Sequence, residues 1–102
     1  MLLREQEWGW AMTPLDFIKS QASYASSYEN IPIEAQARAK KLCWEYNRTP
    51  PDEKERRSAI LQDLLGTYSA MVSIEPDFHC DYGFNIHFHG FAVLNYNCVI
   101  LD

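Results

Sequence analysis

The sequence lacks basic residues after Arg57. All nine Lys and Arg lie at or before this position, where nine Asp and Glu balance them. The other five acidic residues give the last 45 residues the entire formal charge of −5. This half of the chain would repel a phosphate backbone, so nucleic acid is not expected as a partner.

Long apolar runs are also missing. No stretch of about 18 apolar residues is available to span a bilayer. The opening, MLLREQEWGWAM, places Arg4, Glu5 and Glu7 where a secretory signal needs an apolar core. We therefore expect no signal peptide, no membrane and a cytoplasmic location. At 102 residues the chain makes one domain at most and is close to the lower size limit for an independent core.

Closely spaced cysteine pairs are absent. Cys43, Cys80 and Cys98 are an odd number without a C-x-x-C motif, which argues against a disulfide framework and favours reduced thiols. Cys43 lies on the apolar stripe of a predicted helix, and Cys98 occupies the small position of a short repeat described below. Both are expected to be buried packing residues.

Helices are predicted in the first part of the chain. Thr13 and Pro14 provide an N-cap and a first-turn proline for one helix. A second helix from Ile33 has apolar residues at helical spacing: Ala35, Ala39, Leu42, Cys43 and Tyr46. The chain is therefore predicted to start with a helical region.

A third helix is predicted after the sequence NRTPPD. Thr49 and Asp52 fit a capping box, with prolines in the first turn between them. Its buried face is predicted to hold Ile60, Leu61, Leu64 and Leu65. Gly66 stands where a C-cap belongs. The second and third helices should form a hairpin, so residues 1–66 are predicted to be a helical cap and residues 67–102 a β segment.

The β segment contains a repeat of six residues. Met71 to Glu75 is predicted to be a strand that ends before Pro76. From Phe88 onward the residues recur at intervals of six: Phe88, Leu94 and Ile100; Val93 and Val99; Ala92 and Cys98. A plain strand alternates every two residues and needs no small residue at a fixed offset. A parallel β-helix does, because each short side of a coil points one aliphatic residue inward and turns near a small one.

A β-helix coil is stabilised by the coil stacked on it. Three arrangements can cover the last coil: further coils in a longer protein, another subunit, or a rearrangement of the strands into an ordinary sheet.

Three blocks of sequence resemble a known family. ARAKKLCWEYNRTPPDEKERRSAILQDLLG, IEPDFHCDYGFNIH and NYNCVILD are similar, in this order, to the N-terminal half of maltose and galactoside O-acetyltransferases, which are hexapeptide-repeat acyltransferases. The resemblance covers roughly Ala35 to Asp102. It implies an α+β fold in which a helical hairpin cap leads into the first coils of a left-handed parallel β-helix, truncated in this chain, and a homo-oligomer, the trimer of the family.

The resemblance also implies an activity and a missing part. The family uses acetyl-CoA as donor and a sugar hydroxyl as acceptor, with a histidine as general base. In the family this histidine and the coenzyme A site lie beyond the equivalent of Asp102, and none of His79, His87 and His89 occupies its position. No catalytic residue and no bound cofactor are therefore expected here, and the polypeptide is expected to be inactive alone. Whether it should be called an enzyme stays open.

Three residues are assigned to sugar binding by the resemblance. Asn95 matches an asparagine on the acceptor side, Asp81 matches a polar position of the same cleft, and Asp102 falls in an acidic stretch near it. Structural alternatives stay open, because Asn95 can satisfy a coil corner and Asp81 precedes a turn. Aromatic residues of the helical part, Trp44 among them, can line a sugar site or serve as core.

Two other chemistries are less favoured. His87 and His89 would face the same side of a strand and could ligate zinc with His79, Cys80 or Asp81 as a third ligand. In the alternative, Phe88 points inward and both histidines point outward, and we predict no metal site. A Cys80 nucleophile activated by His79 is disfavoured, because adjacent strand residues point to opposite faces.

The sequence therefore favours a relative of sugar O-acetyltransferases. A non-catalytic binding or self-assembly module derived from that family is the alternative.

Overall fold

The computed structural model of the chain describes residue 15 and residues 32–102. The chain divides into two units, Met1–Ile33 and Glu34–Asp102, and nearly all described residues belong to the second. The helix predicted after Thr13 lies outside the described residues except for Leu15. Within the described part, neither helix combines the length and apolar character needed to cross a bilayer.

The helix predicted from Ile33 is confirmed as α3, Ile33–Arg48. Ala39, Cys43 and Tyr46 of the predicted stripe are buried, and Leu42 packs at the edge of the core. The spacing of these residues explains the orientation of the helix, because they lie on one face of a 3.6-residue period.

The predicted capping box is wrong. The next helix, α4, covers Lys54–Leu64, and its N-cap is Glu53, which makes no side-chain cap hydrogen bond. Thr49 instead faces backwards: its hydroxyl donates to the Glu45 carbonyl at 2.7 Å, and its amide donates to the Tyr46 carbonyl at 3.2 Å. Thr49 therefore ends α3, a local hydrogen bond that threonine makes as readily as a forward cap.

The predicted buried face of α4 is confirmed, since Ile60, Leu61, Leu64 and Leu65 are all buried. The role predicted for Gly66 is wrong. The C-cap is Leu65, in an extended conformation. Gly66 lies against the chain at residues 83–86, where a Cβ would overlap the Phe84 carbonyl oxygen. Close backbone approach, not a left-handed cap, is the reason for this glycine.

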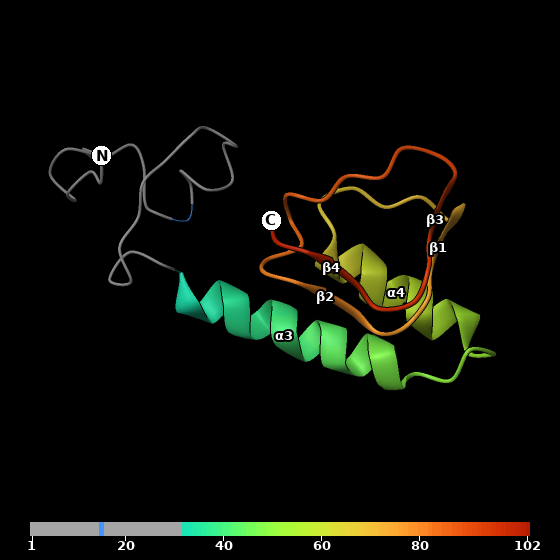
Figure 1. The fold of residues 1–102 in the computed structure, drawn as a ribbon, viewed down its shortest axis with the longest axis horizontal. Coiled ribbons are helices and arrows are strands. Elements are labelled where there is room, and N and C mark those ends of the chain that lie inside the picture. Colours follow the sequence, from blue (N-terminus) through green and yellow to red (C-terminus); the bar gives the residue numbers. More distant parts are fainter. Residues whose placement is uncertain (1–14, 16–31) are drawn as a thin grey trace, which may run out of the picture. The chain divides into compact units, whose positions relative to one another are not determined.

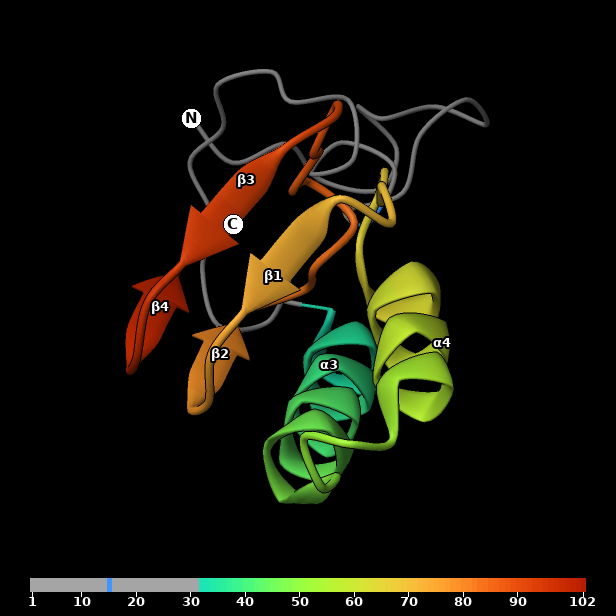
Figure 2. The ribbon, with the colours of Figure 1, turned by 90° about the vertical axis from the view of Figure 1, so that its right-hand side faces the viewer.

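Four short strands follow the helices (Figures 1 and 2). They are β1 (Val72–Ile74), β2 (Phe78–Cys80), β3 (Ala92–Leu94) and β4 (Cys98–Ile100). β1 pairs with β3 and β2 pairs with β4, and both pairings are parallel. The fold of the described residues is therefore α+β, with two helices beside short parallel strands.

The register of the strands is constant. Val72 pairs with Ala92, Phe78 pairs with Cys98, and an isolated parallel bridge joins Thr67 to His87, so every partner lies 20 residues later in the chain. Residues 67–86 therefore make a first circuit of the chain, and residues 87–102 make a second circuit that runs parallel to it. Since the paired strands are parallel, they are not a flat antiparallel sheet.

The repeat of six extends further than predicted. Phe88, Leu94 and Ile100 pack against the core, while Val93 and Val99 are exposed. The same interval relates buried residues of the first circuit: Val72 and Phe78, and Ile74, Cys80 and Ile86. The first circuit holds the more deeply buried residues, because it lies between the helices and the second circuit (Figure 2).

Two polar side chains of α3 fix the helix to the strands. The Tyr46 hydroxyl donates to the Ile74 carbonyl at 2.6 Å. The Asn47 amide binds Phe78 twice: its nitrogen donates to the carbonyl at 3.1 Å, and its oxygen accepts from the amide at 2.9 Å. Asn47 thereby replaces a neighbouring strand for β2. The amide and the carbonyl of Phe78 would otherwise lack these partners, and an unpaired buried backbone group is costly.

We expect Tyr46→Phe to lower the free energy of unfolding by about 1–3 kcal/mol, because it removes two hydrogen bonds of the Tyr46 hydroxyl, one to the Ile74 carbonyl and one from Arg57. The Ile74 carbonyl keeps Arg57 as a donor. Tyr68→Phe is the matched control, since the Tyr68 hydroxyl binds the Ser58 hydroxyl at 3.0 Å in a less buried place. Urea unfolding of both variants measures the difference. Equal losses in the two variants would contradict the prediction that the Tyr46 hydroxyl stabilises the fold more than the Tyr68 hydroxyl does.

Candidate functional site

Asp81 lines a cavity between α3 and the strands β2 and β4. The cavity measures about 560 Å³, and Trp44, Lys40 and Arg48 of α3 also line it. Trp44 is 56% exposed, and the Arg48 guanidinium lies 4.4 Å from its ring centroid. An exposed indole face beside carboxylate and cationic groups can contact both the apolar faces and the hydroxyls of a sugar ring.

Asp102 is engaged with backbone amides. Its carboxylate accepts hydrogen bonds from the amides of Tyr82 at 2.9 Å, Gly83 at 2.7 Å and Asn85 at 3.2 Å. The Asn85 side chain also donates to the Asp102 carbonyl at 3.0 Å. Such charge-assisted bonds hold the turn after β2 against the end of the second circuit.

Asn95 lies in the exposed turn between β3 and β4. Its side-chain oxygen accepts from the amide of Tyr96 at 2.8 Å, and Asn97 nearby has a positive φ of 62°. Among the described residues that line the cavity of Asp81, neither Asn95 nor Asp102 is found. The structure thus brings Asp102 to the turn that follows Asp81, although its side chain does not line the cavity, and it leaves Asn95 in a different turn.

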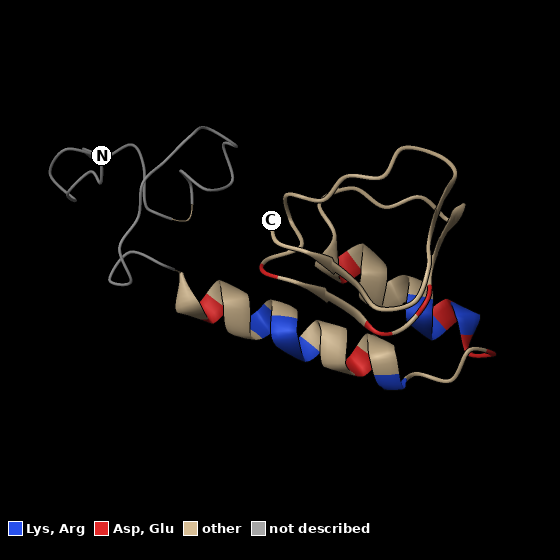
Figure 3. Cartoon of the chain, in the orientation of Figure 1, with Lys and Arg blue, Asp and Glu red and all other residues tan. Residues whose placement is uncertain are grey.

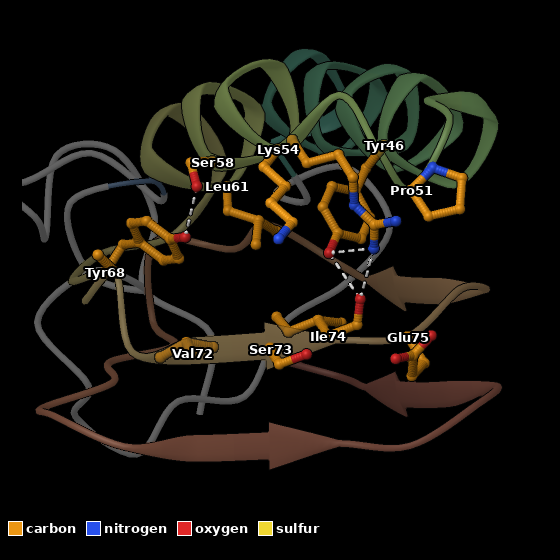
Figure 4. Close-up of a pocket in the computed structure, with 12 residues that line it drawn as sticks. Tyr46, Pro51, Lys54, Ser58, Leu61, Tyr68, Val72, Ser73, Ile74 and Glu75 are labelled. Carbon is orange, nitrogen blue, oxygen red and sulfur yellow. Dashed lines mark hydrogen bonds between the residues drawn. The ribbon is translucent and has the colours of Figure 1, made fainter.

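A second cavity, of about 340 Å³, lies between α4 and β1 (Figure 4). Arg57 crosses it, donating to the Tyr46 hydroxyl at 2.9 Å and to the Ile74 carbonyl at 3.0 Å. Burial raises the pKa of Tyr46, although Arg57 acts in the opposite direction. Tyr46 therefore remains a neutral donor, and Arg57 is occupied by protein acceptors.

The histidines lie on the outside of the strands. His79 is exposed between Phe78 and Cys80, which are buried, so it faces away from the thiol as expected for neighbouring strand residues. His87 and His89 are exposed with stacked rings 6.5 Å apart, and the Nδ1 atom of His87 lies 2.8 Å from the Thr67 hydroxyl. Within residues 15 and 32–102, no three potential ligands gather for a metal ion.

Charge is divided between the helices and the strands. In the described chain Lys and Arg occur on α3 and α4, whereas the β segment carries acidic residues and no Lys or Arg (Figure 3). Arg38 and Asp63 join the two helices through a contact of 2.6 Å that is more than half exposed. Lys40 and Arg48 thus line the same cavity as the acids Asp77 and Asp81.

Sequence reasoning missed Tyr46 and Asn47 as polar anchors. Tyr46 was assigned to the apolar stripe because of its position, and its hydroxyl carries no local signal. Asn47 likewise gives no local signal, because its partner Phe78 lies 31 residues later in the chain. Nor did the sequence place Trp44 beside Asp81.

Comparisons with known proteins agree with these observations. Residues 24–69 match the maltose acetyltransferase hexapeptide capping motif. The chain is 49% identical over 57 residues to nodulation protein L of Rhizobium leguminosarum bv. viciae, covering 56% of this chain and 30% of that protein. It is 32% identical over 91 residues to a putative acetyltransferase of Staphylococcus aureus, covering 89% of this chain and 46% of that protein.

A solved structure is also similar. The maltose O-acetyltransferase of Clostridium difficile 630 superimposes with a TM-score of 0.70 and 34% identity, over 90% of this chain and 49% of the other. The chain spans less than half the length of these three relatives. As the sequence resemblance predicted, this chain carries the capping motif of maltose acetyltransferases and corresponds to the N-terminal part of that family.

Proposed function

We propose that this chain contributes the helical cap and the first strands of an enzyme that transfers an acetyl group from acetyl-CoA to a sugar hydroxyl. The observation that carries the proposal is the match to a maltose O-acetyltransferase over 90% of the chain at a TM-score of 0.70. Relatives described as putative acetyltransferases support the same chemistry.

The β segment is proposed to be the start of a left-handed parallel β-helix. The constant offset of 20 residues between paired strands and the interval of six residues between β1 and β2 support this geometry. In this arrangement residues 1–66 form the cap and residues 67–102 the opening coils. The handedness is taken from the family resemblance.

Asp81, Asn95 and Asp102 are proposed to lie on the acceptor side of the site. Asp81 can accept hydrogen bonds from sugar hydroxyls within its cavity, and the exposed face of Trp44 can stack on the ring. The general base is proposed to come from residues outside this sequence, because none of His79, His87 and His89 has the family position. Acetyl-CoA is proposed to bind outside it as well.

We expect residues 1–102 to release no free coenzyme A from acetyl-CoA in the presence of maltose or a galactoside, since the proposed base is missing. Weak sugar binding is expected and can be followed by NMR titration. Asp81→Asn should weaken this binding several-fold, whereas Asp52→Asn, in the exposed turn between α3 and α4, should leave it unchanged. Turnover by this chain, or equal affinity of both variants, would contradict the proposed roles.

A self-assembling module is the second candidate. Large apolar side chains are exposed on the second circuit and next to it: Phe91, Val93, Tyr96, Val99 and Leu101. A homo-oligomer, with a trimer as the family implies, would cover such a surface. Light scattering and the NMR titration together separate the candidates. A stable oligomer that binds no sugar favours the module, and a chain that binds sugar favours the acetyltransferase.

A further inference from the structure

Cys43 and Cys80 meet in the core although 37 residues separate them in sequence. Their sulfur atoms are 3.8 Å apart and share a hydrogen bond. Cys43 comes from α3 and Cys80 from β2, and their side chains are 1% and 7% exposed. Two thiols at this distance have no role in the proposed acetyl transfer.

The two sulfur atoms are held in place by the anchor between the helix and the strand. Asn47, one helical turn after Cys43, binds both the amide and the carbonyl of Phe78, which lies two residues before Cys80. The anchor fixes the register of α3 against β2. The backbones that carry the two sulfur atoms are therefore held next to each other by the fold, and the short sulfur distance does not depend on side-chain conformation alone.

A small molecule can reach the pair. Both cysteines line the cavity of about 560 Å³ that also contains Lys40, Trp44 and Asp81. Although the thiols are buried from bulk solvent, they border a space far larger than a hydroperoxide. The cavity therefore provides a route from the surface to the sulfur atoms.

We propose that Cys43 and Cys80 form an oxidisable dithiol, which a hydroperoxide converts to an intramolecular disulfide between α3 and β2. Closure requires the sulfur atoms to approach by roughly 1.8 Å, from their observed separation to the usual S–S bond length of about 2.05 Å. Both side chains line the cavity, and rotation about their Cα–Cβ bonds is the movement that we invoke to bring the sulfur atoms together.

The shared hydrogen bond favours the thiolate form of one cysteine and the protonated form of the other, and Cys43 is the candidate for the thiolate. The hydrogen bond from Cys80 lowers the pKa of Cys43 to about 7, against the opposing effect of burial. The same hydrogen bond and burial raise the pKa of Cys80, which therefore keeps its proton. A thiolate is the reactive form towards a peroxide, so the pair provides one nucleophile and one resolving thiol.

The reaction balances with one hydroperoxide. The Cys43 thiolate attacks one peroxide oxygen, the O–O bond breaks, and the leaving oxygen takes a proton, which gives a sulfenic acid. The Cys80 sulfur then attacks the Cys43 sulfur, the S–O bond breaks, and the Cys80 proton leaves with the hydroxide as water. Two thiols and one hydrogen peroxide thus become one disulfide and two waters.

Treatment of the native 102-residue protein with stoichiometric hydrogen peroxide tests this site. We expect the mass to fall by two hydrogen atoms and the melting temperature to rise by roughly 10 °C, because the bond closes a long loop of the unfolded chain. Reduction should reverse both changes. Cys98→Ser should behave like the natural sequence, and Cys43→Ser and Cys80→Ser should gain neither the mass loss nor the rise.

Peptide mapping decides the pairing even if a cysteine variant fails to fold. Because no Lys or Arg follows Arg57, trypsin leaves Cys80 and Cys98 on one peptide, and additional cleavage before Asp81 separates them. A disulfide between the Cys43 peptide and the Cys80 peptide supports the proposal. A bond to Cys98, or oxidation of Cys43 to sulfinic acid without a bond, overturns it. Acetyl transfer takes no part in this readout, so the proposed function stands or falls separately.

Discussion

Gly83→Ala is expected to destabilise the protein by about 3 kcal/mol or more, through a left-handed backbone and a direct overlap. Gly83 has a φ of +88°, a conformation that costs an alanine about 1–2 kcal/mol. A Cβ at this position would also overlap the Leu64 carbonyl oxygen and lie 2.7 Å from the Leu64 Cδ1 atom. Since a backbone oxygen at the end of α4 cannot rotate away, the helix or the turn must shift.

Gly90→Ala is the matched control for this prediction. Gly90 has a similar φ of +92°, but a Cβ there would meet nothing within 4 Å. It should therefore lose only the backbone contribution of about 1–2 kcal/mol. Urea unfolding of both variants, with an unchanged slope, gives the difference that belongs to the Leu64 contact. If both variants lose the same free energy, the close packing of α4 on this turn is not limiting.

The helices could be predicted because their signals are local. The stripe of α3 and the buried face of α4 follow a period of 3.6 within a few turns, and both are confirmed. Thr49 was misassigned because a threonine at a helix boundary can bond forwards as a cap or backwards to the preceding turn. Gly66 was misassigned for a related reason. A glycine after a helix can either adopt a positive φ as a cap or allow another backbone segment to approach closely, and the sequence does not distinguish the two.

The strands show a second limit. The interval of six was recognised from Phe88 but not in the first circuit, although Ile74, Cys80 and Ile86 follow it. The helices cover the first circuit, so its turn from Asp81 to Ile86 serves their packing and departs from a simple repeat. Contacts between distant residues, such as those of Asn47 with Phe78 and Cys43 with Cys80, have no local pattern at all. They arise only when α3 lies on β2.

The second large effect is expected at Asp102. Asp102→Asn should lower the free energy of unfolding by about 2–3 kcal/mol, because an amide replaces a charged acceptor with one acceptor and one donor. The Asp102 carboxylate accepts from three backbone amides of the turn after β2, which itself packs on the end of α4. Unpaired amides would therefore appear beside a buried helix end, and the loss should spread to the core.

Thermal or urea unfolding of Asp102→Asn measures this loss. Asp77→Asn, which changes an exposed acid of the same segment, is the control, and its free energy of unfolding should stay within about 0.5 kcal/mol of the value for the natural sequence.

Stability and sugar affinity together separate two roles of Asp102. Its carboxylate already accepts hydrogen bonds from three backbone amides, so a sugar hydroxyl would have to bind in addition to them or after the turn has moved. A variant that loses sugar affinity at full stability would show that Asp102 serves the ligand and not the turn.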